Sequence, residues 1–297
     1  MTVPRERRRA PLPVGTRGWL LVAIVACALA AWLALGLAPA DLAPRRGGGA
    51  VLVDFLRGMV APALDYESAA VPRGAQPLVL KVARAAWSTV AFAAAAMSLA
   101  LAGGGALGLA ASRAWWSREP AGGRSALARA LRRAGATGAH AAVRALIAGM
   151  RSVHELLWAV LFLAAFGLNT FSAVIAIAIP YAGTLAKVFA EMLDETPPDS
   201  ARSLRAAGAT ETQAFLFGLL PRALPDMSAY AFYRFECAVR SSAVLGFFGF
   251  PTLGYHMKLA ADDLHYREVW TYLYALLAIV VLLELWSGAL RRRVVIR

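Results

Sequence analysis

Charged side chains are scarce in this sequence of 297 residues. They make up 16% of it, whereas about 25% is usual in a soluble domain. Hydrophobic residues make up 59%, and several apolar runs reach about 20 residues, the length that crosses the hydrocarbon of a bilayer. The composition therefore excludes an ordinary soluble protein and predicts an all-α membrane protein that crosses the bilayer several times.

Cysteine is almost absent as well. Cys27 and Cys237 are the only two, and each lies inside an apolar run. Two such residues exclude a disulfide framework and a cysteine-based metal site. The polar group Asp262, Asp263 and His265 is better explained as a solvated loop than as a metal site. We predict no metal ion and no cofactor.

Motifs of enzyme chemistry are also missing. The glycines from Gly103 to Gly108 lack the Lys and the Ser or Thr of a phosphate-binding loop, and no His-Glu-x-x-His zinc motif occurs. The four histidines are scattered along the chain. We therefore predict no catalytic residue and no nucleotide site in this chain.

Six apolar runs are present, and they predict six transmembrane helices. The runs span about 19–37, 82–111, 145–166, 171–189, 227–248 and 269–290. The first is longer than the hydrophobic region of a signal peptide, the alternative that Ala38-Pro39-Ala40 suggests, so we interpret it as an uncleaved span. In the second run, Gly104 and Gly108 have the spacing that lets two helices approach closely in a membrane.

The segments between the runs differ in character. Residues 51–59 carry apolar side chains at helical spacing, which indicates either an amphipathic helix on the membrane surface or a packed loop helix. A surface helix is expected at 125–133, a tight turn at 167–170 and a polar loop at 251–267.

Positive charge dominates the polar segments, and the formal net charge is +13. The arginines cluster at the ends of apolar runs, and no basic face with interleaved aromatics is present, so we predict no nucleic-acid partner. With six spans, the segments on the side of both termini carry 19 Lys and Arg, and the opposite segments carry 7. The positive-inside rule therefore places both termini and the 191–222 connection in the cytoplasm.

The connection Ser200–Pro225 is far more polar than the runs that flank it. Asp199 or Ser200 can cap a first short helix over 201–207. Gly208 suits the left-handed position that follows a helix. The first half of this connection is therefore predicted to be a short helix that ends in a tight turn.

A second short helix is expected over 211–219. Thr210 and Gln213 have the spacing of a capping box at its start, and Pro221 and Pro225 should end it. The result is a helix–turn–helix outside the membrane. Three apolar side chains are expected to be exposed on it and to dock into a groove of a partner protein, unless the hairpin packs on the protein's own surface: Leu204, Phe215 and Phe217.

This hairpin resembles the EAA loop of ABC importer permeases, whose pattern is Glu-Ala-Ala, three residues, Gly, nine residues, Ile, one residue and Leu-Pro. The positions that correspond to it are Arg202, Ser203, Leu204, Gly208, Leu220 and Pro221. The chain departs from the pattern where Arg202 to Leu204 replace Glu-Ala-Ala and where Gly218 replaces Ile. Asp199 and Glu211 are both candidates to substitute for the missing glutamate.

Two further stretches are similar to the phosphonate-type permeases. Residues 233–247 resemble the fifth span of that family, and residues 151–156 resemble the start of the third. The resemblance is strongest over 145–290. It departs at 250–254, where many relatives have a glycine-rich run, so the identity of the substrate stays open.

Charged residues inside the apolar runs form two i,i+4 pairs, Arg151 with Glu155 and Glu236 with Arg240. Charges at membrane depth usually face the bundle interior or water, and they are usually paired. These residues either fix helix packing as ion pairs or line a translocation path. In the second case, Arg234 and Arg240 offer cationic sites to an oxyanion.

The resemblance implies the fold of a type I ABC importer permease and the function of a permease subunit for phosphonate, phosphite, a phosphate ester or another small oxyanion. It implies a multi-pass protein of the inner membrane, with residues 1–81 preceding a core at 82–297 that contains a coupling loop at 191–225. The implied partners are a cytoplasmic ATPase dimer, a second permease subunit that is a copy or a sister chain, and an extracytoplasmic solute-binding protein. ATP hydrolysis would then belong to the ATPase, and the bilayer lipid would surround the spans.

Two other classes of function remain as alternatives. An ion-coupled secondary transporter predicts an inverted repeat and broken spans with acidic coupling residues. A membrane-embedded enzyme predicts a cluster of His or Asp at one membrane face. Neither pattern stands out in the sequence.

Overall fold

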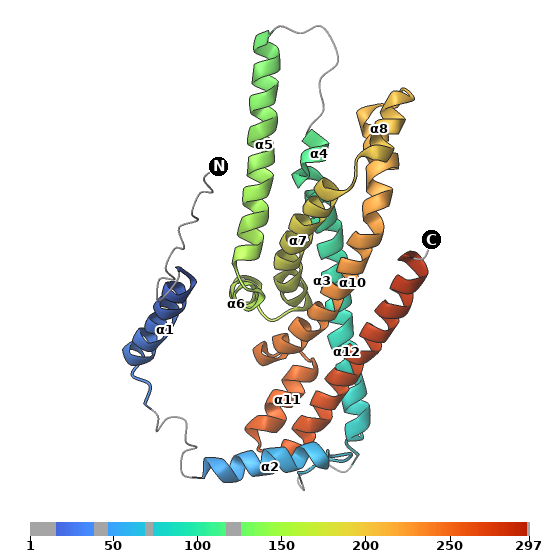
Figure 1. The fold of residues 1–297 in the computed structure, drawn as a ribbon. Coiled ribbons are helices and arrows are strands. Elements are labelled where there is room, and N and C mark those ends of the chain that lie inside the picture. Colours follow the sequence, from blue (N-terminus) through green and yellow to red (C-terminus); the bar gives the residue numbers. More distant parts are fainter. Residues whose placement is uncertain (1–15, 39–46, 69–73, 117–125, 296–297) are drawn as a thin grey trace, which may run out of the picture. The chain divides into compact units, whose positions relative to one another are not determined.

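The computed structural model describes residues 16–38, 47–68, 74–116 and 126–295, and every regular element in these ranges is a helix (Figure 1). In chain order the elements are α1 (Thr16–Ala34), α2 (Gly48–Val60), α3 (Leu78–Ala111), α4 (Arg113–Trp116), α5 (Ala126–Ser152), α6 (Glu155–Phe166), α7 (Thr170–Glu195), α8 (Asp199–Ala206), α9 (Glu211–Gln213), the π-helix η2 (Ala214–Leu219), α10 (Leu220–Val244), the 3-10 helix η3 (Leu245–Phe248), α11 (Leu253–Asp262) and α12 (Tyr266–Val295). The prediction of an all-α protein is confirmed.

The chain divides into two units, Met1–Asp54 and Phe55–Arg297. The first contains α1, whose apolar side chains are largely exposed. The second contains the helices from α3 to α12, of which α3, α7, α10 and α12 pack in a chain of neighbours (Figure 1). The features discussed below lie in this second unit.

Three described helices are long and apolar enough to cross a membrane, namely α3, α7 and residues Tyr266–Leu290 of α12. They correspond to the second, fourth and sixth predicted spans. In α1 the apolar helix Gly18–Ala34 is shorter than this criterion requires. α10 is long enough, but it carries five charged residues: Arg222, Asp226, Arg234, Glu236 and Arg240. By length and composition the described residues therefore supply three spans, or four if a bent pair counts as one, and not the six predicted.

The third predicted span, at 145–166, is not one continuous helix. It consists of the end of α5 and all of α6, which meet at an angle of 89°. The break has a local cause, because His154 has extended backbone and its Nδ1 accepts a hydrogen bond from Leu156 N at 3.3 Å. A side chain that accepts from the second N–H of a helix starts that helix anew. The surface helix expected at 125–133 is the first part of the longer α5.

α3 and α7 pack closely through small residues. A Cβ added to Gly104 would lie 2.8 Å from the Ala182 carbonyl oxygen, and one added to Gly108 would lie 3.0 Å from Phe189 Cβ. Both glycines therefore face α7, and the prediction from their spacing is confirmed. Such contacts replace the hydrophobic effect as the main attraction between helices in lipid.

The predicted polar loop at 251–267 is wrong in part, because most of it forms α11. This helix returns toward the end of α10 through two glycines. A Cβ on Gly254 would lie 2.0 Å from Ala243 O, and a Cβ on Gly246 would lie 2.1 Å from Tyr255 N. Only glycine permits such an approach, so the 250–254 segment has a structural role. Within the helix, Asp262 forms an ion pair with Lys258 at 2.6 Å.

The end of α2 is held by side chains of α12. Trp270 Nε1 donates to Phe55 O at 2.6 Å, and Tyr274 OH donates to Met59 O at 2.7 Å. Gly58 allows the close contact, because a Cβ there would lie 2.8 Å from Trp270 Cδ1. The helix predicted at 51–59 is thus confirmed, and its second half packs on α12.

Candidate functional site

The hairpin between α7 and α10 has the turn that the sequence predicts. Gly208 has φ of +89°, in the left-handed region. The capping box is complete: Gln213 N donates to Thr210 Oγ1 at 3.3 Å, and Thr210 N donates to Gln213 Oε1 at 2.9 Å. Arg205 and Glu211 add an ion pair at 2.8 Å across the turn. This pair was missed, because six residues separate its members and no helix periodicity links them.

The start of α8 differs from the prediction. Its N-cap is Pro198, and no side chain caps it. Asp199 lies inside the first turn instead, with its Oδ1 3.7 Å from Arg202 Nη1. Ser200 Oγ accepts a hydrogen bond from Arg222 Nη1 at 3.0 Å, which ties α8 to the start of α10.

The second half of the hairpin does not end at the prolines. Residues of α9 lead directly into η2 and then into α10, and Pro225 lies inside α10. Leu220 N donates to Phe215 O, five residues back. This widened turn precedes Pro221, which lies exposed in the first turn of α10, where a missing N–H is tolerated. The prediction of a separate second helix over 211–219 is therefore wrong.

The apolar side chains of the hairpin fall into two groups. Phe217 is 72% exposed, as predicted. Phe215 is buried, contrary to the prediction, and its ring contacts Trp115 of α4 with centroids 5.5 Å apart. Leu204 is half-buried, and its Cδ1 would lie 3.2 Å from a Cβ on Gly218. Phe217 is thus the aromatic side chain that projects from the hairpin, and its neighbour Leu216 is also exposed, at 40%.

Gly218 explains how the two halves of the hairpin fit together. A Cβ at this position would lie 2.9 Å from the Ala201 Cα. α8 and η2 therefore touch backbone to backbone where the family pattern has Ile. Among the other pattern positions, Arg202 and Ser203 are exposed, and Ser203 Oγ donates to Asp199 O at 3.0 Å. Leu220 is half-buried and packs against the core.

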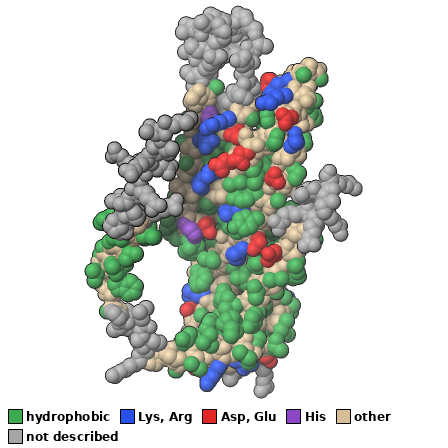
Figure 2. Space-filling view, viewed as in Figure 1, with side chains coloured by type: hydrophobic (Ala, Val, Ile, Leu, Met, Phe, Trp, Pro, Cys, Tyr) green, Lys and Arg blue, Asp and Glu red, His purple; other side chains and the backbone are tan. Residues whose placement is uncertain are grey.

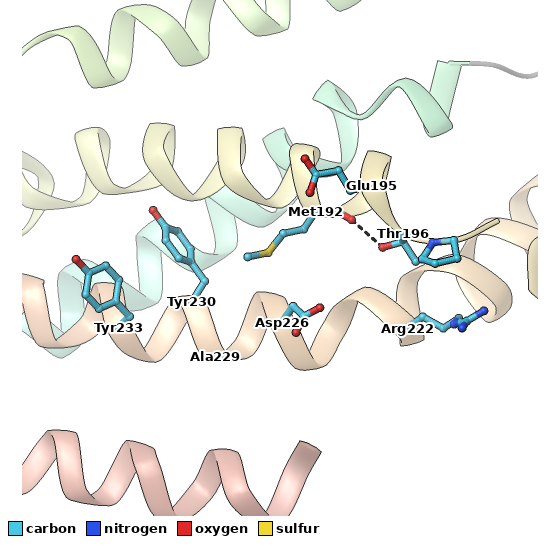
Figure 3. A pocket seen from close by; sticks show the side chains of 9 residues that line it. Met192, Glu195, Thr196, Arg222, Asp226, Ala229, Tyr230 and Tyr233 are labelled. Carbon is cyan, nitrogen blue, oxygen red and sulfur yellow. Dashed lines mark hydrogen bonds between the residues drawn. The ribbon is translucent and has the colours of Figure 1, made fainter. Parts of the chain in front are cut away.

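A hollow of about 760 Å3 lies beside the hairpin, between the end of α7 and the start of α10 (Figure 3). Its α7 side is formed by Met192, Glu195, Thr196 and Pro197, and its α10 side by Arg222, Asp226, Ala229, Tyr230 and Tyr233. The α10 residues recur at helical spacing, so one face of α10 lines the hollow. Acidic and basic side chains gather at this end of the molecule around α8, whereas the surface below is mostly hydrophobic (Figure 2).

Of the two predicted i,i+4 pairs, one forms an ion pair in the structure. Glu236 and Arg240 form an ion pair within α10. Arg151 and Glu155 do not pair in the described residues, because the break between α5 and α6 falls between them. Glu155 Oε2 lies 3.6 Å from His154 Nε2 instead, and Arg151 lines a separate recess with Arg144 and Lys187.

Glu155 belongs to a chain of hydrogen bonds that joins three helices. Ser241 Oγ of α10 donates to Glu155 Oε1 of α6 at 2.9 Å. Tyr181 OH of α7 lies 2.9 Å from the same Ser241 Oγ. Because the serine proton is given to the carboxylate, the tyrosine is the donor in the second bond. Sequence reasoning missed Tyr181 and Ser241, since these partners are 60 residues apart and no short pattern marks them.

The Tyr181 ring supports the third candidate, Arg234. The guanidinium carbon of Arg234 lies 4.4 Å from the centre of that ring, within the range of a cation–π contact. The structure therefore joins Arg234 and Glu155 through Tyr181 and Ser241, while Arg240 is paired separately with Glu236.

The sequence profile of one family, described as "binding-protein-dependent transport system inner membrane component", matches residues 139–296. The chain is 34% identical over 149 residues to the phosphite transport system permease protein PtxC of Stutzerimonas stutzeri, covering 50% of this chain and 54% of that protein. It is 32% identical over 152 residues to the phosphate-import permease protein PhnE of Mycolicibacterium smegmatis, covering 51% and 29% of the two chains. The match thus spans about half or less of the length of these curated relatives.

Solved structures share the fold. The chain is similar to a chain of the MetNI methionine ABC transporter in an inward-facing conformation, with a TM-score of 0.59 and 21% identity. The superposition covers 74% of this chain and 99% of that one. This likeness shows that the two chains share an overall helical fold.

Proposed function

We propose, from the premise that the chain belongs to the family of binding-protein-dependent transport system inner membrane components, that it is the membrane-spanning permease subunit of an ATP-driven ABC importer. The observation that carries the proposal is the hairpin of α8, α9 and η2, which is locked by a left-handed glycine and a capping box and presents an exposed Phe217. A rigid element with one projecting aromatic side chain is suited to dock into a groove of another protein.

The proposed partner at the hairpin is a cytoplasmic ATPase dimer, in which the hydrolysis of ATP takes place. A second permease subunit, either a copy of this chain or a sister chain, completes the membrane part, and an extracytoplasmic solute-binding protein delivers the substrate. Closure of the ATPases would draw two hairpins together and rock the spans between inward-open and outward-open states. The core assigned to transport is residues 82–297, and both termini are placed in the cytoplasm.

The proposed substrate is phosphonate or a related small oxyanion. The names of the relatives point to phosphite and phosphate. The chemistry of α10 agrees with an anion, because Arg234 and Arg240 both lie on this helix with Glu236 between them. We propose that these three residues line the translocation path.

An ion-coupled transporter is less well supported. It requires an acidic side chain that is free to bind and release the coupling ion. Glu236 is paired with Arg240, and Glu155 accepts a hydrogen bond from Ser241. Both acids already have partners in the protein.

Copurification with the ATPase tests the proposal. We expect the full chain to hold a soluble ATPase of the ABC class, and Phe217→Ala to weaken that association by about thirtyfold, since an aromatic contact at the centre of an interface contributes about 2 kcal/mol. The matched control is Phe171→Ala, which alters an aromatic side chain of similar exposure, 56%, at the start of α7. Equal retention of the ATPase by Phe217→Ala and by the control would show that the hairpin is not the coupling element.

A further inference from the structure

Two arginines of α10, Arg234 and Arg240, differ in their counter-charges. Arg240 is neutralised by Glu236 of the same helix. Within the described residues, no carboxylate forms an ion pair with Arg234, and its Nε is buried without an acceptor. A buried N–H of a charged group is costly in free energy when it lacks an acceptor. The guanidinium of Arg234 is therefore suited to bind a ligand transiently.

The protein fixes the guanidinium of Arg234 without using its donors. The contact with the Tyr181 ring covers one face of the guanidinium, and the N–H groups of the two terminal nitrogens lie in the plane, where no described residue accepts a hydrogen bond from them. Tyr181 itself is almost completely buried at 4% exposure. Its hydroxyl is anchored by Ser241 and, through Ser241, by Glu155. Three helices thus hold the ring on which the arginine rests.

Arg234 also lies one helical turn from Tyr230, a residue that lines an open hollow. Tyr230 lines the hollow between α7 and α10 (Figure 3). Arg234 follows it by four residues on the same helix, so its side chain lies on the same face of α10, one turn further along. A small ion that enters or leaves through the hollow would pass Glu195, Asp226 and Arg222 in its lining before it reaches Arg234.

We propose that Arg234 is the residue that binds the oxyanion during translocation, and that Tyr181 positions it through the chain to Ser241 and Glu155. The proposal rests on the proposed function and makes it more specific, because Arg240 is thereby assigned to an internal ion pair. The planar guanidinium matches two oxygens of a phosphite, phosphate or phosphonate group with two parallel hydrogen bonds. Two carboxylates, Glu195 and Asp226, face one arginine, Arg222, in the lining of the hollow, and this excess of negative charge would favour the departure of the anion toward the cytoplasm.

The test uses the complete importer, with its ATPase and binding protein, in proteoliposomes. Phosphite, phosphate and methylphosphonate serve as labelled probes, and substrate uptake is measured together with ATP hydrolysis. Arg234→Gln is expected to lower the number of ions imported per ATP by about tenfold or more, because it removes charged hydrogen bonds. The probe concentration at half-maximal uptake is expected to stay unchanged, since the binding protein captures the probe.

Three further variants distinguish a role of Arg234 in anion binding from a structural role. Arg234→Lys keeps the positive charge but lacks the planar guanidinium, and it should restore part of the number of ions imported per ATP, here called the transport ratio. Tyr181→Phe keeps the ring but releases it from Ser241, and should lower the ratio about threefold. Arg84→Gln is the matched control, because Arg84 is an exposed arginine that donates to Gln76 Oε1 at 2.6 Å and takes no part in the contacts of Tyr181.

The outcomes are distinguishable from failure of the proposed function. If the unmodified importer moves none of the three probes, the oxyanion function and the role of Arg234 both fail. If it imports a probe and Arg234→Gln has the same transport ratio as Arg84→Gln, only the role of Arg234 is overturned. Loss of the assembled complex in both Arg234 variants would also overturn it, because the arginine would then be a structural contact to another subunit.

Discussion

Gly104 and Gly105 are neighbours in α3 with opposite surroundings. A Cβ on Gly104 would meet Ala182 O at 2.8 Å and Leu185 Cβ at 2.9 Å, whereas one on Gly105 would meet nothing within 4 Å. We expect Gly104→Ala to destabilise the protein by about 1–3 kcal/mol, because the extra methyl forces α3 away from α7. The measurement is thermal unfolding in detergent.

Gly105→Ala is the control for that experiment. It introduces the same methyl group one residue away, and it should be neutral or stabilising by about 0.5–1 kcal/mol, since alanine loses less backbone entropy in a helix. Equal unfolding temperatures for the two variants would contradict the account of close helix packing given above.

At the scale of single elements, the turn of the hairpin carries the next prediction. Gly208 has φ of +89°, a conformation that costs an L-residue about 1–2 kcal/mol. Gly208→Ala should therefore loosen the turn between α8 and α9. We expect faster hydrogen exchange over residues 199–219 and weaker binding of the ATPase. Gly138→Ala in α5, where no atom lies within 4 Å of the added Cβ, should leave exchange in the hairpin unchanged.

The hairpin also shows which features the sequence could reveal. Gly208 and the Thr210–Gln213 capping box depend on residues within a few positions of each other, and both were predicted correctly. The burial of Phe215 depends on Trp115, which is 100 positions away along the chain, so no local pattern could reveal it. Local hydrogen bonding can be read from short spacings, whereas the choice between an exposed and a buried aromatic side chain cannot.

The same limit applies to the longer helices. Hydropathy found α3, α7 and α12, because each is apolar over enough residues to cross a bilayer. Hydropathy predicted one span where the structure has the end of α5 and α6, because a break made by one histidine side chain does not change the hydropathy of the segment. The i,i+4 spacing suggested a pair between Arg151 and Glu155, which the break between α5 and α6 removes. The contact of Arg234 with Tyr181 could not be predicted from the sequence, because it forms only when α7 and α10 lie side by side.

At the scale of the whole molecule, the distribution of charge predicts the orientation in the membrane. The segments assigned to the cytoplasm carry 19 Lys and Arg and the opposite segments carry 7, a strong bias by the positive-inside rule. The end that bears α8 is also the more highly charged part of the surface in Figure 2. This bias predicts that the hairpin and the end of α11 lie on opposite sides of the membrane.

Cysteine labelling measures that orientation directly. Because Cys27 and Cys237 are the only cysteines, replacing both by Ser gives a background for single exposed cysteines. Ser203→Cys in the hairpin should react with a membrane-impermeant maleimide in inverted vesicles, whereas Asp263→Cys after α11 should react in right-side-out vesicles. Labelling of both positions from the same side would contradict the orientation. Labelling of Ser203→Cys from the outer side would leave the hairpin unable to meet a cytoplasmic ATPase, so that result bears on the coupling role as well as on the topology.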